Sequence, residues 1–353
     1  MTEQQKPMQV AELTAPRQFR VVSQGIRDPG PGEVQVRVQA VGICGSDLHA
    51  YSEGGIGEYP NVYPMVLGHE PAGTVAMVGP GVTGWSPGDR AALEPAVYCY
   101  HCQFCQTGHH NVCENIRFFS AAGEEPGFFR EFVNLPAHNL LAIPPELAIE
   151  HATIVEPLAV AVHSLQAASP RLGETAAVFG AGPIGLLTIA VLKASGAGRI
   201  WAVEPVAHRR EMAKLVGADA VLDPAALDPT KQILGDTGKR GVDCAIDCAA
   251  KEHTTQWALQ AARSAGRVVI TGIHSTAQVL FDMSTMRRKE LTIYNVRRSN
   301  RESEAALELL ANNVPLFAPL VTHGRPLDRI SEAFEINEAY AGGVVKMIVR
   351  PSA

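Results

Sequence analysis

The sequence has few of the features that mark proteins which bind nucleic acids or membranes. Aromatic residues make up only 6% of the chain, the formal net charge is −6, and no stretch of basic residues alternates with aromatic ones. A nucleic-acid partner is therefore not expected. The N-terminal residues have no apolar signal core, and the longest apolar stretch, residues 176–197, is interrupted by glycines and a proline. We expect a cytoplasmic protein that has no membrane partner and acts on small molecules.

The cysteines do not fit a disulfide framework, since there are seven and most of them cluster. Cys99, Cys102, Cys105 and Cys113 form the pattern C-x2-C-x2-C-x7-C. This spacing can fold four thiolates around one tetrahedral zinc ion, and a closed shell of four cysteines is typical of a structural site. We therefore predict a structural zinc site in this loop. Cys244 and Cys248 fall on a predicted buried strand and are interpreted as core residues.

The length and the order of strand and helix patterns predict two domains. A chain of 353 residues exceeds the roughly 250 that one hydrophobic core usually serves. From about residue 17 to 95 short β-rich runs are separated by turn signals, whereas from about 174 to 290 strands alternate with amphipathic helices, which is typical of a doubly wound parallel sheet. We predict an α/β protein with a β-rich domain over residues 1–157, a dinucleotide-binding domain over 158–291 and a return to the first domain over 292–353.

The segment VFGAGPIG is the clearest sign of a nucleotide site. It places Gly180, Gly182 and Gly185 at G-x-G-x-x-G spacing, directly after a predicted strand and at the start of a predicted helix. The first glycine permits a tight turn, the second lets the backbone approach a pyrophosphate, and the third lets the helix pack on the strand. A tight turn without a ligand is the alternative, but the strand-to-helix context favours a dinucleotide.

Glu204 indicates which dinucleotide is bound. It ends the next predicted strand, nineteen residues after Gly185. An acidic side chain at this point binds the ribose hydroxyls of NAD and repels the 2′-phosphate of NADP. Arg209 and Arg210 follow closely, and arginines there can accommodate that phosphate. NAD is favoured over NADP.

A second group of residues has the mixed ligands of a catalytic zinc. Cys44 lies in GICGSDLH, His69 and Glu70 lie in LGHE, and Glu156 lies in VEPLAV. Three protein ligands with an open fourth position let zinc polarise an alcohol oxygen. Each of these residues also has an ordinary interpretation as a core or ion-pair residue, and spacing alone does not bring residues 44, 69 and 156 together.

Taken together, the motifs resemble those of the zinc-containing medium-chain dehydrogenases, and within them the sorbitol/xylitol dehydrogenase group. The resemblance rests on VGICGSDLH, YPMVLGHEPAGTV, PGDRAALEP, the four-cysteine loop, VEPLAVAVH, VFGAGPIG and VTHGRPLDRISEAFE, which occur in the family's order across nearly the whole chain. It implies a GroES-like β-rich catalytic domain split by a Rossmann NAD-binding domain, an active site in the cleft between them, and a homotetramer.

The resemblance also implies roles for individual residues. Cys44, His69 and Glu70 would reach the catalytic zinc, and Glu156 would either bind it or hold its water. Ser46 and His49 would relay the alcohol proton to solvent. Besides the three glycines, the residues expected to line the dinucleotide are Ile184, Glu204, Arg209, Thr271, Gly272, Ile273, Asn295, Val296 and Arg297.

The implied reaction transfers hydride from a secondary alcohol of a polyol or sugar-like substrate to NAD and gives a ketone. Sorbitol dehydrogenases commonly have tyrosines at the positions of Ala50 and Arg298. An extra arginine would suit a sugar acid or sugar phosphate, since guanidinium binds carboxylate and phosphate by paired hydrogen bonds. The alternative is that Arg298 faces solvent or a neighbouring subunit. (R,R)-butanediol and L-threonine are alternative substrates, and a non-catalytic sensor that binds NAD and zinc is the alternative from another class.

Overall fold

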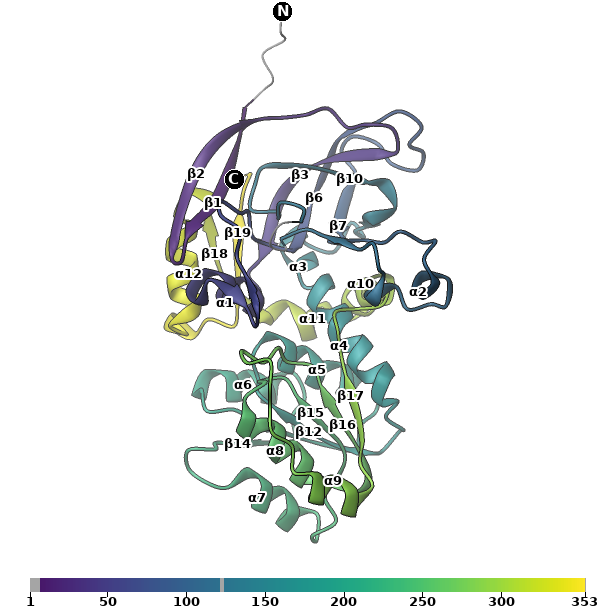
Figure 1. Cartoon of the computed structure of the whole chain (residues 1–353), viewed down its shortest axis with the longest axis vertical. Helices are drawn as coiled ribbons and strands as arrows, with labels where there is room; N and C mark the ends of the chain where they lie inside the picture. Colours follow the sequence, from purple (N-terminus) through teal and green to yellow (C-terminus); the bar gives the residue numbers. More distant parts are fainter. Residues whose placement is uncertain (1–6, 121–123, 353) are drawn as a thin grey trace, which may run out of the picture. The chain divides into compact units, whose positions relative to one another are not determined.

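The computed structural model describes residues 7–120 and 124–352, which form two compact units (Figure 1). The first unit comprises Met1–Glu156, Ser303–Val314 and Val321–Ala353, and the second comprises Pro157–Glu302 and Pro315–Leu320. The predicted α/β fold, with one β-rich and one doubly wound part, is confirmed.

A seven-stranded, mostly antiparallel sheet forms the centre of the first unit. Its order is β11-β7-β6-β3-β19-β18, with β10 paired to the other half of β3. The bounds are β3 Glu33–Gly42, β6 Glu70–Val78, β7 Arg90–Leu93, β10 Phe132–Pro136, β11 Leu140–Ala142, β18 Val321–Pro326 and β19 Lys346–Arg350. Alternation in β3 buries Val34, Val36 and Val38 completely, which is the pattern of a strand with a core-facing side.

Smaller elements complete the first unit around this sheet. A β1–β2 hairpin, helix α12 and the buried aromatic residues Phe128, Phe129 and Phe334 enclose its core. The bounds of these elements are β1 Pro7–Ala15, β2 Gln18–Gly25, α1 Gly45–Glu53, β4 Gly55–Ile56, β5 Tyr59–Pro60, β8 Ala96–Val97, α2 Gln103–Gln106, β9 Arg117–Phe118, α3 Ile149–Ala152, α10 Ser303–Asn312 and α12 Ile330–Glu338.

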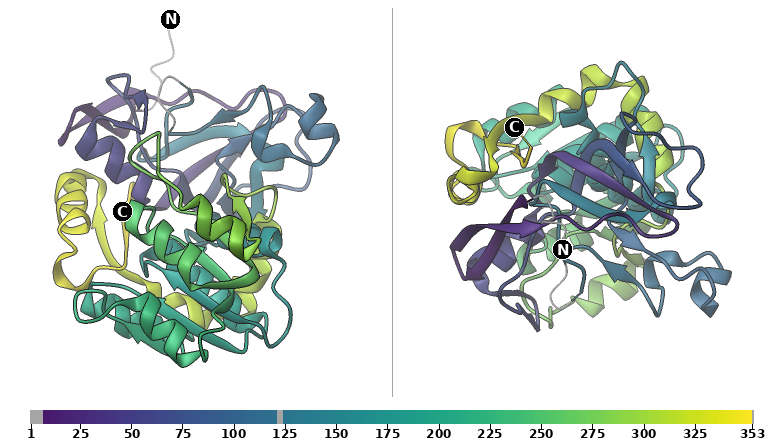
Figure 2. Two further views of the ribbon diagram at one scale, coloured as in Figure 1. Left: turned by 60° about the horizontal axis from the view of Figure 1, so that its bottom comes forward. Right: turned by 90° about the horizontal axis from the view of Figure 1, so that it is seen from above.

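The second unit is a six-stranded parallel sheet with helices packed along it. The strand order is β14-β13-β12-β15-β16-β17, and every neighbouring pair is parallel. The strands are β12 Thr175–Phe179, β13 Arg199–Val203, β14 Ala220–Leu222, β15 Val242–Asp247, β16 Ala262–Ile270 and β17 Thr292–Asn295. The helices are α4 Val155–Ala168, α5 Pro183–Ala194, α6 Ala207–Leu215, α7 Pro229–Asp236, α8 Glu252–Ala261, α9 Met283–Lys289 and the short α11 Val314–Phe317. In the left view of Figure 2, the green helices α8 and α9 lie over this sheet.

The position of β17 differs from the predicted domain boundary at residue 292. The sequence places this strand in the segment that returns to the first domain, whereas in the structure it pairs with β16 at the edge of the parallel sheet. The chain leaves the second unit only after Glu302. A short apolar strand has the same sequence pattern in either sheet, so its partner is decided by tertiary pairing.

Two further expectations concern buried cysteines and membrane spans. Cys244 lies inside β15 and is fully buried, while Cys248 follows the end of that strand and is partly buried.

Among the residues that the structure describes, no helix is both long and apolar enough to cross a bilayer.

Candidate active site and metal centres

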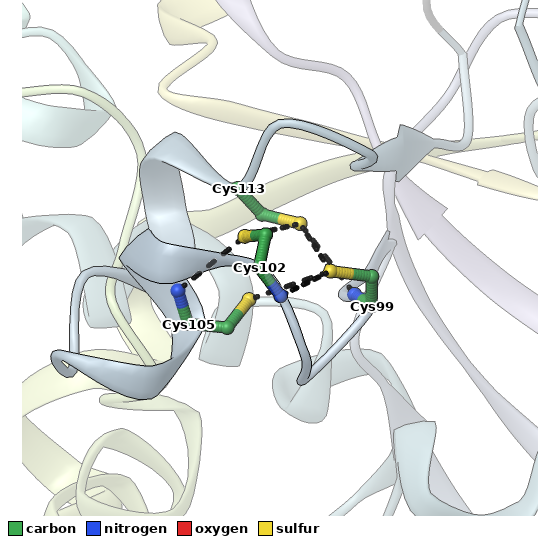
Figure 3. Close-up of side chains that lie close together, drawn as sticks. All are labelled: Cys99, Cys102, Cys105 and Cys113. Atoms are coloured by element: carbon green, nitrogen blue, oxygen red, sulfur yellow. Dashed lines mark hydrogen bonds between the residues drawn. The ribbon is translucent and has the colours of Figure 1, made fainter.

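The four cysteines of the C-x2-C-x2-C-x7-C segment point toward a common centre (Figure 3). The Sγ atom of Cys99 lies 4.0 Å from that of Cys105 and 3.4 Å from that of Cys113. The Sγ atoms of Cys102 and Cys113 are 3.9 Å apart, and none of the four forms a disulfide. Four sulfurs bound tetrahedrally to zinc at the usual bond length lie about 3.8 Å from one another. The geometry fits one zinc ion with no open position.

The thiols at this centre differ in acidity because burial and hydrogen bonds act on them unequally. Desolvation acts to raise the pKa of Cys99, but backbone N–H groups of His101 and Cys102 lower it to about 6. Burial, followed by hydrogen bonds with neighbouring thiols, raises the pKa of Cys105 to about 12. Four thiolates this close together therefore require a cation, and zinc binding would release the remaining protons.

The loop that holds these cysteines has little apolar core of its own. Besides the cysteines, its buried cluster consists of Ala96, Tyr98 and Phe118, with Ile116 packed against it. A cluster this small does little to offset the ordering of the loop, so a metal ion held by the four cysteines would be a main source of its stability.

Cys44, His69 and Glu70 form a second group of possible metal ligands. Their ligand atoms lie within 4.8 Å of one another. Cys44 follows the end of β3, whereas His69 and Glu70 stand at the start of β6. These strands pair antiparallel with Gly42 opposite Glu70, which brings the three residues together. Thiolate, imidazole and carboxylate are the mixed donors of a catalytic zinc site.

Asp47 orients the imidazole of His69. Its Oδ1 atom lies 3.4 Å from Nδ1 of His69, and its carboxylate accepts hydrogen bonds from the backbone N–H groups of Cys44 and Gly68. A proton held on Nδ1 leaves Nε2 as the metal-binding atom. Burial acts to lower the pKa of His69, but the charges of Asp47 and Cys44 and the hydrogen bonds from His69 to them outweigh burial and hold this pKa well above its usual value.

Lys346 is the second residue of this site that the sequence did not reveal. Its Nζ atom forms an ion pair with Oε2 of Glu70 and donates a hydrogen bond to the carbonyl oxygen of Ile43. Both charged side chains are almost completely buried. They lie directly against the backbone of Gly42, where an added Cβ would be 2.0 Å from Oε2 of Glu70. A glycine is therefore required at residue 42.

Glu156 lies near this group, at the start of α4, but is not among the three residues whose ligand atoms converge. Burial, together with the charges of Glu70 and Glu94, raises the pKa of Glu156 to about 8, although His69 acts in the opposite direction. A buried carboxyl group with this pKa is poised to lose its proton when a cation arrives.

The two residues predicted to relay a proton both lie on α1. The Oγ atom of Ser46 lies 3.4 Å from Nε2 of His69, so Ser46 stands beside the possible metal ligands. His49 instead pairs with Glu53 one turn later, with 2.9 Å between Nδ1 and Oε1. The described contacts do not include a direct bond between Ser46 and His49.

The glycine-rich turn of the second unit has the geometry of a dinucleotide loop. Gly180 has φ 92°, a conformation that L side chains rarely adopt, and an added Cβ at Gly185 would lie 1.9 Å from the carbonyl oxygen of Gly180. Gly182 precedes the first turn of α5. A Cβ atom added at Gly182 would have open space around it, with only Nη1 of Arg209 within 4 Å, at 3.9 Å. Ile184 lies in the first turn of α5. Backbone amides at this helix start can therefore meet an anion.

Glu204 follows the end of β13 and contacts this turn. Its carboxylate accepts hydrogen bonds from the backbone N–H groups of Ala181 and Val206, at 2.7 and 2.9 Å. Two bonds leave acceptor capacity for ribose hydroxyls. Arg210 is engaged elsewhere, since it donates to the carbonyl oxygen of Glu204 and pairs with Asp223 at 2.9 Å.

The other predicted dinucleotide contacts lie at the same carboxyl edge of the parallel sheet. Thr271, Gly272 and Ile273 directly follow β16, while Asn295 ends β17 and precedes Val296 and Arg297. Thr271 is buried and donates a hydrogen bond to Ser164. Ile273 is 54% exposed, so an apolar surface is available at this edge.

Comparison with protein families assigns the chain to one class. The family of alcohol dehydrogenase GroES-like domains matches residues 30–145, and the family of zinc-binding dehydrogenases matches residues 183–312. The chain belongs to the zinc-binding alcohol dehydrogenases and is a zinc-dependent oxidoreductase.

Individual relatives match over almost the whole chain. Sorbitol dehydrogenase of Bacillus subtilis (strain 168) is 32% identical over 98% of both proteins. L-threonine 3-dehydrogenase of Pyrococcus abyssi (strain GE5 / Orsay) is 36% identical over 98% of this chain and 97% of its own. Among solved structures, a candidate zinc-binding dehydrogenase from Sinorhizobium meliloti 1021 bound to NADP has a TM-score of 0.90 and 31% identity, covering 98% of this chain and all of its own (100%).

Proposed function

We propose that the protein oxidises a secondary hydroxyl of a polyol or sugar-like substrate to a ketone and transfers the hydride to NAD. The observation that supports this most directly is the convergence of Cys44, His69 and Glu70 within 4.8 Å. A non-catalytic sensor would be expected to have lost one of these ligands, and all three are present and close together.

In this proposal the first unit prepares the alcohol for oxidation. Zinc held by Cys44, His69 and one of the two glutamates would supply a Lewis acid that stabilises an alkoxide. Asp47 fixes the tautomer of His69, and Lys346 fixes the carboxylate of Glu70. Ser46, which lies beside His69, would accept the hydroxyl proton and pass it toward solvent, with His49 as the next candidate acceptor.

The second unit would bind the dinucleotide across the carboxyl edge of its parallel sheet. The first turn of α5 would meet the pyrophosphate, and Glu204 would accept hydrogen bonds from the adenosine ribose. NAD is favoured over NADP because an acidic side chain such as Glu204, beside the glycine-rich turn, would repel a 2′-phosphate, and Arg210 is paired with Asp223. The NADP bound by the Sinorhizobium relative makes this preference a necessary test for this chain.

The substrate class is proposed from the relatives and from one local difference. The relatives include dehydrogenases of sorbitol and of L-threonine, which both carry secondary hydroxyl groups. Arg298, where sorbitol dehydrogenases commonly have tyrosine, stands three residues after β17 with φ 54°. It makes a sugar acid or sugar phosphate the second candidate. We also propose a cytoplasmic homotetramer, as in similar enzymes.

The test is the formation of NADH by zinc-loaded protein. Neutral polyols, butanediol, L-threonine, sugar acids and sugar phosphates are each offered with NAD and with NADP. Activity on neutral polyols with NAD supports the proposal, whereas activity confined to anionic substrates and abolished by Arg298→Tyr would replace it with the second candidate. No turnover of any substrate by protein that binds NADH and zinc would favour the sensor.

A further inference from the structure

Three side chains of the second unit form a hydrogen-bonded array that neither the sequence motifs nor the proposed function uses. Asp247 ends β15, Thr255 lies in α8, and His274 follows β16. The hydroxyl of Thr255 lies 2.7 Å from Oδ2 of Asp247 and 3.0 Å from Nε2 of His274. Asp247 and Thr255 are completely buried, and His274 is partly exposed.

The direction of these hydrogen bonds follows from the single proton of the Thr255 hydroxyl. A carboxylate only accepts, so this proton is donated to Asp247 over the shorter distance. The hydroxyl oxygen then accepts a hydrogen bond from the Nε2–H group of His274. The array therefore ties the imidazole of His274 to a buried negative charge through one intermediate hydroxyl.

Asp247 also holds the two backbone segments next to His274. Its Oδ1 atom accepts hydrogen bonds from the N–H groups of Ala249 and Ala250. Its carbonyl oxygen accepts from the N–H groups of Thr271 and Gly272, at 2.9 and 3.0 Å. Asp247 thus fixes the beginning of the segment from Thr271 to His274, and the bond from His274 to Thr255 fixes its end.

The order of the strands shows which half of a dinucleotide this segment faces. The glycine-rich turn follows β12 and Glu204 follows β13, so the adenosine half belongs to that side of the sheet. In doubly wound sheets the dinucleotide crosses the point where the strand order reverses. Here this point lies between β12 and β15, and the nicotinamide half must then lie over the carboxyl ends of β15 and β16, where Asp247 and Thr271 stand.

We propose that His274 is a positioning residue for the nicotinamide half of the cofactor. By bonding to Thr255, it holds Thr271–Ile273 in the conformation that receives the nicotinamide riboside, without taking part in hydride transfer. The inference rests on the proposed dinucleotide binding. It predicts that removing this hydrogen bond weakens the binding of ligands that contain the nicotinamide half and leaves the binding of the adenosine half unchanged. A general loss of stability would weaken the binding of both.

The experiment measures dissociation constants for NADH and for ADP-ribose with the zinc-loaded protein. ADP-ribose retains the adenosine half and lacks the nicotinamide ring. His274→Ala and Thr255→Val remove the hydrogen bond between these two residues from opposite ends. His274→Gln retains a donor and Thr255→Ser retains a hydroxyl. His253→Ala is the control, because His253 lies on α8 like Thr255 but contacts Trp257 instead of His274. The net value of one hydrogen bond corresponds to an increase of about threefold to tenfold in the dissociation constant.

The expected result is that His274→Ala and Thr255→Val weaken NADH binding to a similar extent, that the double variant is no weaker than either, and that ADP-ribose binding is unchanged. His274→Gln and Thr255→Ser should restore most of the affinity. Unchanged NADH binding in His274→Ala, or an equal loss for both ligands, would overturn the inference while leaving dinucleotide binding intact. A wild-type protein that does not bind NADH would instead contradict the proposed function itself.

Discussion

The ammonium of Lys346, at the start of β19, is paired with the carboxylate of Glu70, at the start of β6, and both side chains are shielded from solvent. The pair packs against Gly42, which lies two residues before Cys44 and opposite Glu70, the residue after His69. A buried ion pair of this kind adds little net stability, but removal of one partner leaves an uncompensated charge. Glu70 is therefore held by a cation of the protein whether or not it also reaches a metal.

Replacing Lys346 tests this relationship. Lys346→Met should lower the free energy of unfolding by about 3 kcal/mol or more, because the Glu70 carboxylate remains buried without its counter-charge. Urea denaturation of the zinc-free protein measures the change. Lys346→Met/Glu70→Gln should recover much of the loss, and a single variant as stable as the wild type would show that the pair is not coupled.

Proton release on zinc binding distinguishes the two candidate carboxylate ligands. At pH 7 the carboxyl group of Glu156, with a pKa of about 8, is mostly protonated before the metal arrives, whereas the carboxylate of Glu70 forms an ion pair with Lys346. If Glu156 binds the catalytic zinc, Glu156→Gln should release about one proton fewer than the wild type, as measured with a pH indicator. Equal release by both proteins would contradict zinc binding by Glu156 and leave Glu70 as the carboxylate ligand.

The four-cysteine centre should hold one of two zinc ions. Cys105→Ser should lower the zinc content from about two ions to about one per chain and lower the midpoint of thermal unfolding, because the loop has little other core. Elemental analysis after gel filtration gives the metal content. Cys244→Ala is the matched control, since it removes a buried thiol outside both centres; an equal loss of zinc in this control would contradict the assignment.

Asp243 should make the free energy of unfolding depend on pH in the acidic range. Burial acts to raise its pKa, but hydrogen bonds from Arg240, Thr175 and Arg263 outweigh burial and hold the pKa of Asp243 well below its usual value. A folded-state pKa below the unfolded one gives stabilisation that is fully present above about pH 4 and is lost as the pH falls through the folded value. Asp243→Asn should lower the free energy of unfolding by about 3 kcal/mol at pH 7. Below about pH 4 the free energy of unfolding of this variant should depend less on pH than that of the wild type.

The pH series for Asp243 needs a control for the general effect of acid. Glu252→Gln removes an exposed carboxyl group from α8 in the same unit and should follow the wild type at every pH. A parallel pH dependence of the wild type and Asp243→Asn, monitored by chemical denaturation from pH 7 down to pH 2, would show that Asp243 does not contribute as described.

Local sequence patterns predicted those parts of the structure whose geometry is set by neighbouring residues. The glycine spacing and the four-cysteine spacing each lie within one short, continuous segment of the chain, so that segment defines the turn or the cluster. The meeting of Cys44 with His69 depends instead on the register of β3 against β6, which includes irregular steps at Gln35/Val36 and at Val38/Ala40. No spacing rule gives that register, and only the resemblance to a family predicted it.

Residues that support the site were less visible in the sequence than the ligands. Asp47 has a local signal, because it stands three residues after Cys44 at the start of a helix, where an acidic side chain caps backbone N–H groups. Lys346 had no local signal, because it reaches Glu70 from the last strand of the chain. The pairing of β17 with β16 is likewise set by tertiary contacts, which is why this strand lies in the parallel sheet although it follows the predicted boundary at residue 292.

The most direct test of the account is the zinc dependence of NADH formation from a secondary alcohol. Protein freed of zinc with a chelator is assayed with NAD before and after zinc is restored, alongside His69→Ala. We predict that zinc restores turnover in the wild type, and that His69→Ala stays inactive although it still binds NADH and retains the four-cysteine zinc. Equal turnover in the zinc-free protein, or in His69→Ala, would contradict the assignment of Cys44, His69 and the neighbouring glutamates as the catalytic centre.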